Sequence, residues 1–393
     1  MNRKAIITAI SLAAVFSQAA PAQQGPATAP RFDNSSAAPV LDADTSARLN
    51  AIDGMIRDRM NTLKIPAYCI TVIMNGRVLM HKPYGYANLS NGQPAQNNTV
   101  FGLASLTKTF TALTLLSLVD KGLIGLDDPL EKYIGKLTPA YRTLTIRQLA
   151  SMTAGVPSKV EKEVFWNEQL EILDHTPLES QPGTAFLYSN FSYRLLGSVI
   201  ESVTGRPFFE VLRETVLAPF QMNSTATTAL LQESGRLAKP YGDDMGRGPL
   251  REIEYKDPRI SFSAGMLAST SDDLVNYVFG LMNRRVLSEK GFKTLWYERP
   301  PLRGGAPSKW AFGWAAMKSP AYGNQYSVSM NGGTPGVAST IIILPEANSA
   351  VIALSNLRKP PVYELAKTAA RIAFGNPNQD GSDEPGPVES GAD

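Results

Sequence analysis

Hydrophobic residues fill one central stretch of the chain, residues 110–119, in which the only polar side chains are hydroxyls. A helix that is apolar on nearly every side packs inside a protein rather than on its surface. Gly122 follows this run and suits the position just past the C-terminus of a helix. The pattern therefore predicts a buried central helix that begins near Ser105 and ends before Gly122.

The residues before this helix predict another helix and then a hairpin. Residues 45–63 carry apolar side chains at helical spacing, and a proline shortly afterwards ends that run. Two β-rich runs, residues 68–74 and 77–80, flank the pair Asn75-Gly76. An Asn-Gly pair between such runs is the strongest short-range signal for a β-hairpin.

The residues after the central helix predict helices first and strands last. The pattern is helical to about residue 255, with a well-marked helix at 193–203, and residues 269–273 form an N-terminal cap for a further helix. Turns containing Gly332-Gly333 and residues 346–348 join three β-rich runs. These runs and the closing helix that follows them are residues 326–330, 339–344, 350–355 and 361–374.

Strands at both ends of the chain with helices between them predict an α/β (α+β) fold. The expected architecture is an antiparallel sheet built from N- and C-terminal strands and flanked by helices. A helical lobe is inserted at about residues 125–260, within a domain that spans residues 44–374. The natural place for a site is a cleft between the two lobes.

The length, composition and charge of the chain limit the kinds of protein that it can be. The 393 residues are 43% hydrophobic and 19% charged, which suffices for one large or two modest cores. The net charge is only +3 and no run of lysines and arginines occurs, so the sequence predicts no nucleic-acid partner. We expect a small-molecule substrate instead.

The first residues of the chain have the order of a secretory signal peptide. Two basic residues precede the apolar residues 5–16, and the small residues 20–22 form a cleavage site, which predicts a leader over residues 1–22. An uncleaved membrane anchor is the alternative, although the apolar run is shorter than the roughly 20 residues that cross a bilayer. No other stretch of the sequence is long enough to span a membrane.

The leader and the cysteine content together indicate a compartment. Residues 23–43 are typical of a flexible spacer, and residues 375–393, with almost no apolar content, are typical of a disordered tail. Cys69 is the only cysteine, so we expect no disulfide and no thiolate metal site. An exported protein of this kind is expected in a bacterial periplasm or the surrounding medium.

The candidate chemistry begins with Ser105 and Lys108, the only Ser-x-x-Lys spacing in the sequence. Residues three apart lie on the same face of a helix. Ser105 would lie at the positive N-terminal end of the central helix, and burial of Lys108 would favour its neutral amine. This arrangement suits a serine nucleophile that no histidine serves. The spacing alone is weak evidence, because a capping serine beside a solvated lysine produces it too.

A histidine-based serine hydrolase is disfavoured. The only histidines, His81 and His175, stand in no motif, and a histidine in such a context is more often structural than catalytic. The Gly-x-Ser-x-Gly turn of α/β-hydrolases is absent as well. The base is therefore expected to be another residue.

Tyrosine is the other candidate for acid/base chemistry. The spacing Tyr-x-Asn occurs at Tyr86, Tyr188 and Tyr322, and only Tyr188 follows a Pro-Gly turn and opens a helix. That position would present the phenol at a loop rim, with Asn190 capping the helix or facing substrate.

Four ordered motifs resemble the serine β-lactamase-like superfamily. They are Ser105–Lys108, Gly122–Pro129, Pro182–Asn190 and Gly332–Gly336. Within the superfamily the chain looks closest to class C β-lactamases, low-molecular-weight penicillin-binding proteins and family VIII esterases, over roughly residues 45–374. Four motifs in order are far more specific than any one of them.

The resemblance implies a role for each candidate. Ser105 would be acylated, Lys108 would accept its proton directly or through Tyr188, and Tyr188 would help to activate water for deacylation. The backbone N–H groups of Ser105 and Gly333 would form the oxyanion hole. Asn190 would hold the acyl amide of the substrate or orient Lys108.

One position departs from the superfamily pattern. The third motif normally presents a Lys or His, a small residue and a Gly on the edge strand, where this chain has Met330, Asn331 and Gly332. Because Met330 has no charge to hold a substrate carboxylate, β-lactamase and D-Ala-D-Ala peptidase activities are disfavoured relative to a family VIII esterase. Met330 could also be a packing residue of that strand.

No metal or cofactor is expected. Four acidic residues that stand in turn or cap contexts are interpreted as structural: Asp127, Asp128, Asp272 and Asp273.

The leading hypothesis is therefore an exported serine hydrolase that cleaves a small ester or amide through an acyl-enzyme on Ser105. A β-lactamase or a D-Ala-D-Ala-type peptidase of the same fold is the first alternative. The second is a slowly deacylating penicillin-binding protein or a degenerate binding protein, suggested by the missing cation at Met330.

Overall fold

The computed structural model describes residues 41–135, 137–159, 164–243, 248–255, 257–358 and 360–375. The helices and strands lie in the unit Ala43–Asp393. The predicted leader, nearly all of the predicted spacer and the tail beyond Gly375 lie outside the described residues.

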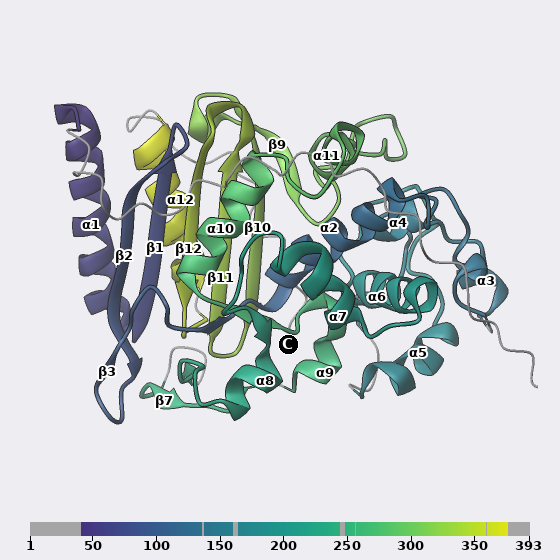
Figure 1. The fold of residues 1–393 in the computed structure, drawn as a ribbon, viewed down its shortest axis with the longest axis horizontal. Coiled ribbons are helices and arrows are strands. Elements are labelled where there is room, and N and C mark those ends of the chain that lie inside the picture. The colour runs from purple at the N-terminus through teal and green to yellow at the C-terminus, as the bar shows by residue number, and fades with distance from the viewer. Residues whose placement is uncertain are drawn as a thin grey trace, which may run out of the picture. The chain divides into compact units, whose positions relative to one another are not determined.

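An antiparallel sheet joins the two ends of the described chain (Figure 1), as the sequence predicts. Strand β1 pairs with β2 on one side and with the C-terminal strand β12 on the other. In spatial order the seven strands are β3 (Gln93–Pro94), β2 (Arg77–Asn88), β1 (Ala67–Met74), β12 (Ser349–Ser355), β11 (Val337–Leu344), β10 (Gln325–Thr334) and β9 (Ala315–Ser319).

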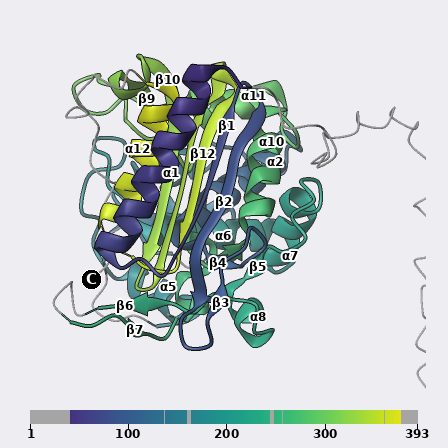
Figure 2. The same cartoon turned by 90° about the vertical axis from the view of Figure 1, so that its left-hand side faces the viewer.

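Helices cover both faces of this sheet. Helices α1 and α12 pack against each other and on one face, as Figure 2 shows, and α10 packs on β1 and β12 from the other. The helices described are α1 (Ala43–Leu63), α2 (Thr107–Asp120), α3 (Pro139–Arg142), α4 (Ile146–Ala150), α5 (Trp166–Asp174), α6 (Asn190–Thr204), α7 (Phe208–Leu212), α8 (Thr228–Glu233), α9 (Pro258–Ser261), α10 (Ser271–Met282), α11 (Glu289–Trp296) and α12 (Pro360–Phe374). None of them is long and apolar enough to span a membrane.

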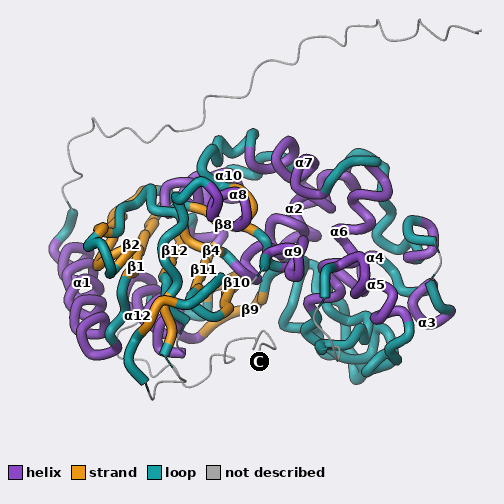
Figure 3. The backbone as a smooth tube through the Cα atoms, turned by 90° about the horizontal axis from the view of Figure 1, so that it is seen from below, coloured by secondary structure: helices purple, strands orange, loops and turns teal. Residues whose placement is uncertain are grey.

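The segment predicted as a helical lobe lies beside the sheet and contains α3 to α9 (Figure 3). Short strands that the periodicity did not reveal lie within this segment and on either side of it in the sequence, because runs of two or three residues show too little alternation. A three-stranded sheet comprises β4 (Phe101–Gly102), β8 (Leu267–Ser269) and β5 (Ala226–Thr227), and a two-stranded sheet comprises β6 (Tyr241–Gly242) and β7 (Arg251–Glu252).

The hairpin predicted at Asn75-Gly76 is confirmed. Both residues have left-handed backbone angles, φ +50° and +72°, which suit a two-residue hairpin turn. Strand β2 continues to Asn88, well beyond the predicted end at residue 80, and pairs with β1 as far as Gly85.

The C-terminal strands differ from the prediction in two ways. Gly332 and Gly333 lie within β10 rather than in a turn, and Pro335 and Gly336 form the turn to β11. Strand β9, which was not predicted, occupies the edge of the sheet, so β10 is not the edge strand. The pairing of β9 with β10 ends at Ser329, and the rest of β10 therefore has an uncovered side.

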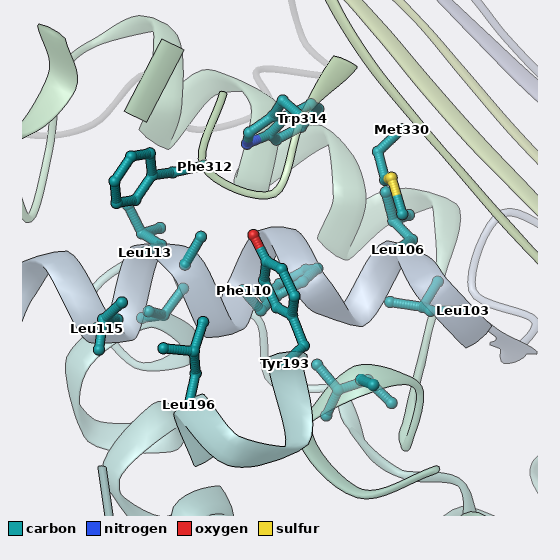
Figure 4. Close-up of a cluster of buried hydrophobic side chains, with 14 of the residues drawn as sticks. Leu103, Leu106, Phe110, Leu113, Leu115, Tyr193, Leu196, Phe312, Trp314 and Met330 are labelled. Carbon is teal, nitrogen blue, oxygen red and sulfur yellow. The ribbon is translucent and has the colours of Figure 1, made fainter. Parts of the chain in front are cut away.

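The central helix α2 is buried from Thr107 to Leu118, as the apolar pattern predicts. Figure 4 shows its side chains packed against residues of α6, β10 and the loop before β9. Buried hydroxyls need partners, and here they bind neighbouring segments: Thr111 Oγ1 donates to the carbonyl oxygen of Ser263 at 2.6 Å, and Tyr277 Oη donates to Thr109 Oγ1 at 2.9 Å. These bonds fix α2 in position as well as burying it.

The helix ends follow ordinary capping chemistry. Thr270, within the predicted cap, accepts a hydrogen bond from the Asp273 backbone N–H at the start of α10. Gly205 ends α6 in a left-handed conformation, φ +64°. At the start of α6 the cap is Ser189, so of the two alternatives for Asn190, capping the helix is not the one observed. Asn190 is the first residue of the helix, which leaves its side chain available for another contact.

Gly332 is expected to be required for the junction between β10 and α2. A Cβ there would overlap the carbonyl oxygen of Leu103 and come within 2.9 Å of the Leu106 amide nitrogen. We predict that Gly332→Ala lowers the free energy of unfolding by about 1–3 kcal/mol, measured by urea denaturation. The matched control is Gly54→Ala in α1, where nothing lies within 4 Å and Ala raises stability by about 0.5–1 kcal/mol. Wild-type stability of the Gly332 variant would contradict the described packing.

Candidate active site

Ser105 lies on a short 3-10 turn, Ala104–Leu106, that leads directly into α2. Two bonds to Leu103 anchor this turn: its N–H donates to Leu267 O at 2.8 Å, and its carbonyl accepts from Ser339 Oγ at 2.7 Å. Ala104 has φ +44°, a strained value for a residue with a side chain. The first N–H groups of a helical turn have no intrahelical acceptor, so the Ser105 amide is available to an anion.

Lys108 is fully buried, and its ammonium meets three acceptors. Nζ donates to Ser105 Oγ at 3.0 Å, to Asn190 Oδ1 at 2.7 Å and to the carbonyl oxygen of Ala264 at 3.0 Å. A lysine ammonium has three protons and no lone pair, so these bonds use all of its donors. The contact between Ser105 and Lys108 that the spacing predicts is therefore present.

Burial lowers the pKa of Lys108 well below the ordinary value of 10.5, and the nearby Arg194 charge lowers it further. A neutral amine has two protons and one lone pair. Asn190 Oδ1 and Ala264 O can only accept, so they retain the two protons, and the lone pair points to Ser105 Oγ. The geometry therefore favours Lys108 as the base that removes the serine proton.

Tyr188 lies over the same site. Its ring centroid is 4.9 Å from Lys108 Nζ, and the ring packs edge-on against Trp310. Burial raises the pKa of the Tyr188 phenol, and the Ser105 hydroxyl beside it lowers that pKa in part. The two hydroxyls are not aligned as a regular hydrogen bond, and no other partner of the phenol is found within the described residues. The phenol therefore stays protonated at neutral pH and suits proton transfer better than service as an anionic base.

The uncovered end of β10 lies beside the serine. Backbone groups of successive residues point to opposite sides of a strand, so those of alternate residues point to the same side. The amides of Asn331 and Gly333 therefore share one side of β10, and both residues lie beyond Ser329, the last residue of β10 that pairs with β9. Gly332 packs on the turn that carries Ser105. An acyl oxygen between the amides of Ser105 and Gly333 would accept two hydrogen bonds, the arrangement of an oxyanion hole.

Met330 and Asn331 differ in their surroundings. Met330 is 4% exposed, belongs to the hydrophobic core and lies against Leu106, as Figure 4 shows. Met330 is therefore a packing residue of β10, one of the two alternatives that the sequence left open. Asn331 is half-buried and, by strand alternation, lies on the same face of β10 as Gly333, where Tyr363 of α12 approaches.

Two contributors to the site were missed in the sequence. The Ala264 carbonyl has no sequence signal, because every residue supplies one. Arg194 is buried and follows Asn190 by four residues in α6, a spacing that places both on one helix face. That spacing from the Tyr-x-Asn motif could have identified Arg194.

The histidines and the four aspartates that the sequence indicates are structural lie in the following surroundings. His81 binds Thr71 Oγ1 at 2.7 Å and Asp272 Oδ1 at 2.8 Å, which links β2 to α10. Asp127 and Asp128 accept hydrogen bonds from Arg147 and Lys132 respectively, and Asp273 accepts from Thr225. His175 ends α5.

Comparison with known proteins covers most of the chain. The family model described as Beta-lactamase matches residues 52–375. Penicillin-binding protein 4* of Bacillus subtilis (strain 168) is 28% identical over 325 residues, which are 77% of this chain and 71% of that protein. Protein flp of Staphylococcus aureus (strain MW2) is 28% identical over 331 residues, 80% of this chain and 64% of that protein. The chain thus spans less than two thirds of protein flp.

Solved structures agree with the described fold. The octameric penicillin-binding protein homologue from Pyrococcus abyssi has a TM-score of 0.72 and 25% identity, over 84% of this chain and 78% of that chain. D-amino acid amidase from Ochrobactrum anthropi SV3 has a TM-score of 0.70 and 23% identity, over 83% of this chain and 97% of that chain. At this identity the amidase supports the fold alone.

The lowered pKa of Lys108 generates a prediction about the reactivity of Ser105. Only the neutral amine can take the serine proton, so the rate of labelling by a fluorophosphonate probe should rise with pH and level off well below 10.5. Lys108→Met should lower this rate by at least about 100-fold. The control is Lys132→Met, which removes an exposed lysine paired with Asp128. A labelling rate that rises up to pH 10.5 would contradict the assignment of Lys108 as base.

Proposed function

Because the chain belongs to the β-lactamase family, within the serine β-lactamase-like superfamily, we propose that it hydrolyses a small ester or amide through an acyl-enzyme on Ser105. The observation that carries the proposal is the contact between Ser105 Oγ and the buried Nζ of Lys108. A serine at the start of a helix with a base of lowered pKa beside it has what nucleophilic catalysis requires.

The acylation step follows from the hydrogen bonds around Lys108. The neutral amine takes the Ser105 proton as Oγ attacks the carbonyl carbon, and negative charge develops on the carbonyl oxygen. The amides of Ser105 and Gly333 stabilise that charge. Lys108 then returns a proton to the leaving group, directly or through the Tyr188 phenol, and the ester bond to Ser105 remains.

Deacylation reverses these roles with water as the nucleophile. Tyr188 and Lys108 lie together at the serine, so a water that enters after the leaving group departs can give its proton to this pair. Asn190 holds Lys108 in place throughout, through the bond of 2.7 Å to its side-chain oxygen. We assign Asn190 the role of a positioning residue.

The lack of charge on Met330 supports an ester or amide as the substrate. Its buried thioether offers no charge to a substrate carboxylate at the position where β-lactamases and D-Ala-D-Ala peptidases carry a cation. An ester or amide that does not need this cation is therefore favoured over a β-lactam or a D-Ala-D-Ala peptide, which remains the alternative.

Export from a bacterial cell is part of the proposal and rests on the leader pattern of residues 1–22. Fractionation of cells that express the full chain tests it, because an exported protein loses the leader mass and leaves the cytoplasm.

We predict that the purified protein hydrolyses 4-nitrophenyl acetate and that Ser105→Ala lowers kcat/KM by at least about 1,000-fold. The control is Ser117→Ala, a buried serine of the same helix whose hydroxyl donates to Thr114 O. A chromogenic cephalosporin should have a lower kcat/KM than the ester. Faster turnover of the cephalosporin would favour the β-lactamase alternative, and ester hydrolysis that survives in Ser105→Ala would refute the proposal.

Tyr188→Phe should slow deacylation by about 100-fold, because water loses a partner for its proton. Intact-mass spectrometry should then detect an acyl group on Ser105 during turnover. The control is Tyr193→Phe, a buried phenol of α6 that donates to Ala150 O. If the unaltered protein itself keeps the acyl group for hours, the slowly deacylating alternative is correct instead.

A further inference from the structure

A tyrosine of α12 binds the peptide unit that supplies the Gly333 amide. Tyr363 is buried, and its hydroxyl donates to Gly332 O at 2.9 Å. This carbonyl and the Gly333 N–H are the two ends of one planar, resonant peptide group. A carbonyl oxygen has two lone pairs, so the sheet does not prevent this bond. The hydroxyl therefore acts on the amide of the candidate oxyanion hole through a single peptide bond.

Close packing holds the hydroxyl at this carbonyl. A Cβ on Gly333 would overlap Tyr363 Oη, so the approach of the phenol to the backbone depends on glycine. The peptide is trans, and in a trans peptide the C=O and N–H bonds point in opposite directions. Tyr363 therefore binds the peptide unit without occupying the position at which the Gly333 N–H would meet an acyl oxygen.

The Tyr363 phenol also accepts a hydrogen bond, from Arg358. Burial raises the pKa of the phenol to about 12, although the charge of Arg358 and its hydrogen bond act in the opposite direction. The hydroxyl therefore keeps its proton at neutral pH and can donate it to Gly332 O. Because hydrogen bonds in a chain polarise one another, a phenol that accepts from a guanidinium is a stronger donor than an isolated one.

We propose that Tyr363 strengthens the oxyanion hole by polarising the peptide group between Gly332 and Gly333. The inference rests on the hydrolase function proposed above and adds a positioning residue to it. A hydrogen bond to the carbonyl draws electron density onto its oxygen, which makes the N–H more positive and a better donor to the acyl oxygen. This gain grows with the charge on the acyl oxygen, so it favours the transition state over bound substrate.

Removal of the Tyr363 hydroxyl tests this role. Tyr363→Phe keeps the ring and should lower kcat/KM for 4-nitrophenyl acetate by about 3- to 10-fold, the loss expected for one hydrogen bond. The dissociation constant of phenylboronic acid, measured by calorimetry, should rise by a similar factor. Ser105 Oγ adds to its boron and the serine proton passes to Lys108, which gives an anionic tetrahedral boronate without turnover. The matched control is Tyr326→Phe, a buried phenol of β10 that donates to Trp296 O at 2.6 Å, and it should leave both values unchanged.

Fluorinated tyrosines in place of Tyr363 separate polarisation from packing. 3-Fluorotyrosine and 3,5-difluorotyrosine have progressively more acidic phenols of nearly the same shape, so kcat/KM should rise and the dissociation constant of phenylboronic acid should fall with each fluorine. Unchanged values in Tyr363→Phe would overturn the proposal. A loss in Tyr363→Phe with no response to fluorine would also overturn it, because a merely structural role predicts that result. Either result leaves the hydrolase function intact, whereas ester hydrolysis independent of Ser105 refutes the hydrolase function itself.

Discussion

The arrangement of the candidate active site depends on the burial of the Lys108 amine. Moving a lysine out of water is costly unless its donors are satisfied or its proton is lost. Around Lys108 the acceptors come from the turn before α2, from the first residue of α6 and from the loop before β8. Asn190 and Ala264 follow Lys108 in the sequence by 82 and 156 residues respectively. The same nitrogen therefore fixes their relative positions and places a base on the serine.

The second feature on which the candidate active site depends is that β9 pairs with only part of β10. Had β9 continued along β10, it would have paired with the segment that contains Asn331 and Gly333. The pairing stops at Ser329, and the turn that carries Ser105 approaches β10 just beyond this point, at Gly332. The site is thus built where the ladder of a sheet is left incomplete, with glycine at the point of closest approach.

Features that depend on local pattern could be predicted from the sequence. The burial of α2, the Asn75-Gly76 hairpin and the strands at both ends are confirmed, because each follows from residues close together in the chain. Gly332-Gly333 was misread as a turn, since the approach of Leu103 that requires glycine is a tertiary contact. Strand β9 is short and Ala-rich and gave no periodic signal, although its partner β10 follows it directly in the sequence. The Ala264 carbonyl and the protonation of Tyr188 depend on burial, which spacing does not reveal.

The pairing of β1 with β12 has a consequence for how the molecule is made. The Ala67 N–H donates to Asn356 Oδ1 across 289 residues, so the middle of the sheet joins the first strand to the last. Contacts so distant in sequence form late and slow folding. During synthesis, Ser105 and Lys108 are made before β10. Strand β1 cannot pair on its second edge until β12 has been made. The nucleophile and the strand that lies beside it can therefore meet only after β10 has been made, and a chain cut short before residue 325 has the serine but not the Gly333 amide.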